Sequence, residues 1–201
     1  MIYDVLNILK AETKKYLMDV DTANNITDID DTSVVIENIA NADATTEGKT
    51  QNKVCISLYN INEEQTLKNA PRHERVNGEM VYKSNPAYLN LYVMISANRT
   101  SYEKSLKNIS SVVEFLQDKP VFTNTNTDVE ITDVEEFKFR VDLYSLPPEQ
   151  LSYAWGVLGG KVLPSALYKI SVIKLQKQAI KAAAPLITGI QETAFNKTKN
   201  L

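Results

Sequence analysis

Apolar residues recur along this chain with the spacing of helices in three segments. Residues 2–18 and residues 102–119 place apolar side chains three and four positions apart, which predicts two amphipathic helices. Pro120 ends the second of these helices. A third helix is expected over residues 148–158, because a Pro-Pro pair suits its start and a Gly-Gly pair suits its end.

Alternating apolar and polar residues predict strands between these helices. The strand candidates are residues 34–36, 53–61, 87–97, 121–123, 137–146 and 166–175. The 87–97 segment is the most apolar of them and is expected near the centre of the sheet. Residues 62–86 carry charges, Asn, Gly and two prolines without a sustained period, so we interpret them as a long connection.

Together these elements predict an α+β fold, with a mostly antiparallel (mixed) sheet flanked by about three helices. We expect residues 1–176 to form the domain and residues 177–201 to form a basic C-terminal helical tail, bent at Pro185. Leu106 is expected on the buried face of its helix, and Leu143 on the buried face of its strand.

The net charge of −3 hides a strong asymmetry along the chain. Residues 1–50 hold ten acidic and four basic side chains, whereas residues 151–201 hold seven lysines and one glutamate. Oppositely charged ends suit head-to-tail contact between copies, although a solvated lysine-rich surface explains the charge equally well. The lysines are dispersed, without arginine and with a single late aromatic residue, so we expect no nucleic acid as partner.

Catalytic and metal-binding chemistry is scarce in this sequence. The only cysteine and the only histidine, Cys55 and His73, could form a nucleophile and base, but Cys55 lies mid-strand and His73 lies in a polar segment. Asp28, Asp30 and Asp31 have the spacing that begins a calcium loop, yet the required glycine and glutamate are missing. We therefore expect no enzyme, no metal and no cofactor.

The chain carries no signal of membrane insertion or secretion. No apolar run approaches the roughly 18 residues that a membrane helix needs, and the start of the chain lacks a charged region and a cleavage site typical of a signal peptide. The expectation is a protein made in the cytoplasm, without a membrane span.

Three blocks carry a family resemblance through their order and spacing: VCISLYNINEEQTLKNAP, NPAYLNLYVMISANRTSYEKSLKNISSVVEFLQDKPVFT and LPPEQLSYAWGVLGGKVLPSALYKISVIKLQ. The positions that match the pattern are Leu58, Tyr59, Asn60, Pro86, Leu89, Leu91, Tyr92, Leu151, Trp155, Ser165 and Tyr168. The blocks resemble the cap proteins, or tail terminators, of extracellular contractile injection systems of the antifeeding-prophage and Photorhabdus-virulence-cassette type. The resemblance covers about residues 1–176, and longer relatives carry a further C-terminal region.

This resemblance implies a structural role. Cap proteins of this kind form a homo-hexameric ring on the distal end of the inner tube and the contractile sheath, where the ring ends polymerisation and ties sheath to tube. The implied partners are the tube subunit and the sheath subunit of an extracellular or cell-anchored injection particle. A second hypothesis, from another class, is an assembly chaperone or peptide-binding module that is not retained in the particle.

The strand at residues 165–175 is our candidate for the sheath or ring interface. It is long, leads toward the basic tail, and could accept a partner strand if it lies at an edge of the sheet. An ordinary central strand is the competing interpretation. The candidate interface residues are Tyr168, Lys169, Ile170, Ser171, Val172, Ile173, Lys174, Lys177 and Lys181.

Overall fold

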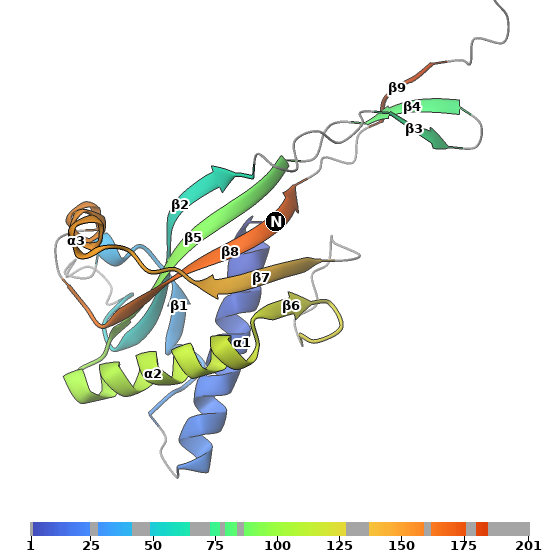
Figure 1. Ribbon diagram of the computed structural model, residues 1–201. Coiled ribbons are helices and arrows are strands. Elements are labelled where there is room, and N and C mark those ends of the chain that lie inside the picture. The colour runs from blue at the N-terminus through green and yellow to red at the C-terminus, as the bar shows by residue number, and fades with distance from the viewer. Residues whose placement is uncertain are drawn as a thin grey trace, which may run out of the picture.

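The computed structural model describes residues 2–24, 28–41, 49–64, 73–76, 79–83, 87–127, 137–158, 162–175 and 180–184. Its helices are α1 (Ile2–Ala23), α2 (Tyr102–Asp118), α3 (Pro148–Val157) and a single 3₁₀ turn (Ile39–Asn41). Its strands are β1 (Val34–Ile36), β2 (Lys53–Glu63), β3 (His73–Val76), β4 (Glu79–Lys83), β5 (Ala87–Asn98), β6 (Val121–Thr123), β7 (Lys138–Leu143), β8 (Ser165–Leu175) and β9 (Ile180–Ala184). Figure 1 shows how these elements are arranged.

Six of the strands form the main sheet, in the order β1-β2-β5-β8-β7-β6. β1 runs parallel to β2, and all the other neighbours are antiparallel. The most apolar strand, β5, lies inside the sheet between β2 and β8, as its composition predicted. The α+β fold class is thus confirmed.

Helices cover both faces of this sheet, and successive residues of its strands are buried on alternate faces. Val54 and Ile56 of β2 pack with α1 and α2, whereas Cys55 between them packs with Trp155 and Leu158 at α3. Figure 1 shows α1 and α2 together on one side and α3 apart from them. Trp155 is buried in the core, as its position on the apolar side of α3 indicated.

A partly buried ion pair joins the two helices on the larger face. Lys119, which follows α2, donates to Glu12 of α1 at 2.7 Å, and Glu12 is only 7% exposed. Lys119 also donates to the Asn126 carbonyl at 2.6 Å. The same lysine therefore fixes the end of α2 against both α1 and the turn after β6.

A second, three-stranded sheet has the order β3-β4-β9, and Figure 1 shows it beyond the ends of β2 and β8. Two expectations are wrong here. Residues 62–86 contain two strands as well as connection, and residues 180–184 form a strand, where a helix was expected. The alanine-rich sequence of β9 favours a helix, but antiparallel pairing with β4 overrides that local preference.

Two leucines expected in the core are exposed instead. Leu143 is 55% exposed because β6 pairs with β7 only as far as Arg140, which leaves the end of β7 at the margin of the sheet. Leu106 is 45% exposed because the buried stripe of α2 runs through Ser105, Asn108 and Val112, beside Leu106.

Candidate interaction surfaces

The single cysteine is a core residue. Cys55 is fully buried, and burial raises the pKa of its thiol to about 12. A thiol with that pKa stays protonated at neutral pH and is a poor nucleophile. For His73, the structure describes only its backbone, in β3.

The acidic loop before β1 is held by basic side chains. Arg99, whose side chain is fully buried, contacts the Asp28 carboxylate at 2.7 Å and also donates to the Asp28 and Asn52 carbonyls. Lys104 contacts the other Asp28 oxygen at 2.8 Å. The hydrogen bond from Lys104, supported by Arg99, holds the pKa of Asp28 below its ordinary value of 3.8.

These contacts give the acidic loop a structural role. Asp28 joins the loop to the end of β5 and the start of α2, so its carboxylate is engaged within the chain. Within the part of the chain that the structure describes, no group of three or more His, Cys, Asp or Glu side chains is arranged to hold a metal ion.

The structure places the predicted interface strand inside the sheet. β8 pairs with β5 along most of its length, and Tyr168–Ser171 pair with β7 on the other side. The expectation that β8 is an edge strand is therefore wrong over these residues, because a strand paired on both sides has no free main-chain groups to offer. Tyr168 and Ile170 are also buried, at 2% and 0% exposure.

The other predicted interface residues fall on several elements. Lys169 and Ser171 are partly buried on β8. Val172, Ile173 and Lys174 belong to the end of β8, and Lys181 belongs to β9; only their backbones are described. Lys177 lies outside the described residues. The interface role assigned to these residues stays a prediction.

β2 and β7 each extend past the short strand beside them, and among the described residues no strand covers the extension. We call these stretches the β2 edge (Leu58–Asn62) and the β7 edge (Asp142–Leu143). β1 pairs only with Val54–Ile56, so it stops short of the β2 edge. β6 pairs only with Lys138–Arg140, so it stops short of the β7 edge. Sequence patterns could not identify either edge, because strand order is decided by long-range pairing.

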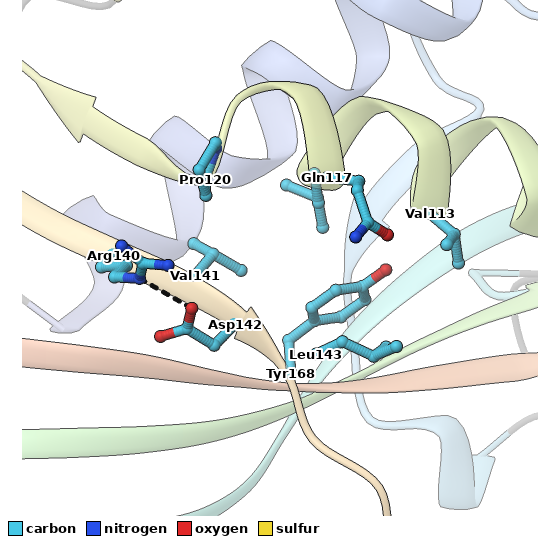
Figure 2. A pocket seen from close by; sticks show the side chains of 9 residues that line it. Val113, Gln117, Pro120, Arg140, Val141, Asp142, Leu143 and Tyr168 are labelled. Carbon is cyan, nitrogen blue, oxygen red and sulfur yellow. Dashed lines mark hydrogen bonds and ion pairs between the residues drawn. The ribbon is translucent and has the colours of Figure 1, made fainter.

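A groove lies beside the β7 edge, between β7 and the last turns of α2 (Figure 2). Its volume is about 150 Å³, and Val113, Gln117, Val141, Leu143 and Tyr168 are among its lining residues. Figure 2 shows the Tyr168 ring directed from β8 toward α2, and the Arg140–Asp142 ion pair on the β7 side.

Tyr168 is the unusual member of this groove. Its hydroxyl is buried and has no hydrogen-bond partner among the described residues. Burial raises the pKa of this phenol to about 12.

A wider hollow of about 480 Å³ lies near the β2 edge, lined by Ile36, Tyr59 and Val157 among others.

The outer side of α3 and the segment after it expose apolar residues. Tyr153, Val157 and Val162 are each more than 70% exposed. The sequence indicated only the buried side of this helix, because a short apolar helix with Ala154 and Trp155 inward gives no signal for what its other side does.

Comparison with known proteins identifies a family that matches this chain. Residues 4–189 match a protein family described as the Pvc16 N-terminal domain. The chain belongs to this family. That membership confirms the resemblance to cap proteins seen in the sequence. No curated protein sequence matches the chain.

Two solved structures share the fold of this Pvc16 N-terminal domain. One is the sheath/tube terminator of PVC, an extracellular contractile injection system, in its extended state: TM-score 0.60, 15% identity, 98% of this chain and 64% of that chain covered. The other is the anti-feeding prophage cap, a tube-terminating cap: TM-score 0.60, 14% identity, 96% and 62% covered. The chain therefore spans less than two thirds of the length of either protein.

None of the helices in the described part of the chain combines the length and the apolar character that crossing a membrane requires.

Proposed function

We propose that this chain is a structural terminator of a contractile injection particle. In this role it forms a ring on the distal end of the tube and contractile sheath, ends their polymerisation and ties the sheath to the tube. The observation that carries the proposal is that the fold matches the PVC sheath/tube terminator over 98% of this chain, in agreement with the family match.

The chemistry of the described residues supports a role in assembly. The cysteine is inert in the core and Asp28 is engaged by Arg99 and Lys104, while apolar side chains and strand edges are exposed. Exposed strand edges and apolar residues are the usual material of protein–protein contacts. We therefore propose a non-enzymatic protein without a cofactor, whose partners are its own copies in a homo-hexamer, the tube subunit and the sheath subunit.

We also propose where the chain acts. It is made and assembled in the bacterial cytoplasm and becomes part of the extracellular or cell-anchored particle. The assembly chaperone remains the competing function, because it would use the same exposed surfaces and then leave the finished particle.

Quantitative mass spectrometry of purified particles separates these two functions. A terminator remains in the particle at about six copies for each capped end. The tube and sheath subunits are more numerous, because they repeat in every layer of the particle. A chaperone is absent from mature particles but present in assembly intermediates. Absence from intact particles that have normal distal ends contradicts the terminator proposal.

A further inference from the structure

The β2 edge and the β7 edge lie at opposite margins of the sheet but at the same level along its strands. Leu58 pairs with Val93, Val93 with Tyr168, and Tyr168 with Leu143. The neighbouring row of paired residues runs from Ile61 through Leu91 and Ile170 to Val141. The first row therefore runs from the β2 edge to the β7 edge, whereas the second ends at Val141, whose outward N–H bonds the Pro120 carbonyl.

Main-chain groups at the β7 edge point away from the sheet. Val141 donates its N–H outward to the Pro120 carbonyl at 2.8 Å, and Tyr144 donates its N–H inward to the Leu167 carbonyl at 2.8 Å. Because successive residues of a strand alternate in direction, the Leu143 N–H points outward, like that of Val141. In the part of the chain that the structure describes, no strand pairs with β7 at this position.

The β2 edge presents outward groups in the same way. The Ile61 N–H donates to the neighbouring Asn60 side chain at 2.8 Å and so takes no part in the ladder with β5. Among the described strands, none pairs with the outer side of Leu58–Asn62. The Asn60 side chain satisfies this outward donor in the single chain, and a partner strand that pairs here replaces that bond with a main-chain one.

Each edge also carries an exposed apolar side chain. Ile61 is 42% exposed and Leu143 is 55% exposed. Ile61 is paired with Leu91, so it projects from the sheet face that α1 and α2 cover, and the groove beside Leu143 opens on that same face. With a volume of about 150 Å³, this groove can receive one side chain of the size of isoleucine.

We propose that copies of this chain join edge to edge, with the β2 edge of one copy added to the β7 edge of the next. Three antiparallel steps separate β2 from β7, so the two strands run in opposite directions. Copies related by rotation about an axis along the strands then pair these edges antiparallel. The contact uses a different surface on each partner, so copies joined in this way form a closed ring when the rotation between neighbours is a whole fraction of a full turn. This inference rests on the ring that the proposed function requires and names the surfaces that build it.

Two proline variants test the contact. Ile61→Pro and Leu143→Pro each remove one outward N–H without removing a donor of the ladder to the neighbouring inner strand. We expect each variant alone to stay monomeric in sedimentation, with self-association weakened about tenfold or more, because main-chain hydrogen bonds and an apolar contact are lost together.

Sedimentation of a mixture of the two variants is the decisive experiment. Ile61→Pro keeps an intact β7 edge, and Leu143→Pro keeps an intact β2 edge, so one competent contact remains between them. We expect the mixture to form one-to-one dimers and no closed rings. If either variant alone forms rings as the wild type does, or if the mixture of folded variants stays monomeric, the edge contact is wrong.

Circular dichroism and thermal melts establish that the variants fold. If proline prevents folding, Ile61→Lys and Leu143→Lys replace it, since both side chains are exposed and a charge there opposes pairing. The wild type, crosslinked on purified particles, separates this inference from the proposed function. A chain that caps particle ends but crosslinks only as a monomer overturns the edge contact alone, whereas a chain missing from the particles overturns both.

Discussion

At the scale of single residues, the buried side chain of Arg99 connects segments that lie far apart in the sequence. Its buried guanidinium joins the Asp28 loop, the turn at Asn52 and the end of β5. Asn52 adopts a left-handed conformation with φ of 56°, which asparagine tolerates better than most residues. The contacts of Arg99 hold these loops in place near the start of α2.

We predict that Arg99→Ala lowers the free energy of unfolding by about 3 kcal/mol, because it leaves the Asp28 and Asn52 carbonyls and one Asp28 carboxylate oxygen without their buried donor. Lys104→Ala is the matched control on the same carboxylate. Lys104 is half exposed, and its loss is expected to cost less than about 1 kcal/mol. Urea denaturation measures both values, and equal losses would contradict the assignment of the main role to Arg99.

Asp28 makes the folding stability depend on pH in the acidic range. Its pKa is lower in the folded chain than its ordinary value of 3.8, so its stabilising contribution is present above that value and is lost as the pH falls through the folded pKa. We predict that Asp28→Asn, already less stable at neutral pH, loses less further stability than the wild type between about pH 5 and about pH 3. Parallel acid profiles of the two proteins would show that another carboxyl group is responsible.

Tyr168→Phe isolates the buried hydroxyl. Because that hydroxyl has no partner among the described residues, its removal relieves a desolvation cost, and we expect the free energy of unfolding to rise by about 1 kcal/mol. Thermal and chemical denaturation measure the change. A clear loss of stability would mean that the hydroxyl does find a hydrogen bond in solution.

At the scale of elements, β9 belongs to the smaller sheet and not to the six-stranded one. Every strand of the six-stranded sheet ends by Leu175, and β9 pairs with β4 only. We therefore predict that deleting residues 177–201 leaves the main domain folded, with an unchanged thermal midpoint for its core. We expect particles that contain this variant to have uncapped or over-long sheaths.

A chain that ends at residue 184 is the control for this deletion, because it keeps β9. If only the longer deletion impairs capping, the three-stranded sheet is responsible; if both do, the residues after it are responsible. Normal caps and normal sheath lengths with both variants would show that the C-terminal segment is dispensable.

The sequence predicts elements well where one strong period decides them and poorly where long-range pairing decides. The apolar stripe of α1 and the alternation of β2 identify those elements locally. The hairpin of β3 and β4 has a local signal, Asn77-Gly78, but the surrounding charged residues obscure it. Whether β8 is central or at an edge depends on where β7 pairs, which no local pattern contains.

At the scale of the whole molecule, the account rests on two surfaces of one sheet and a fold shared with terminators. The β2 edge and the β7 edge would join copies into a ring, while the β3-β4-β9 sheet lies beyond the ends of β2 and β8 in Figure 1. That separation leaves the smaller sheet available for a different contact from the one that joins neighbouring copies.

The length of the particles, with and without this chain, tests the central claim most directly. Electron micrographs of particles from cells that lack the chain are compared with particles from the same cells after the wild-type chain is restored. The account predicts over-long or variable tubes and sheaths without a distal ring when the chain is missing, and uniform length with a ring when it is restored. Particles of uniform, normal length with complete distal ends in its absence would contradict the account.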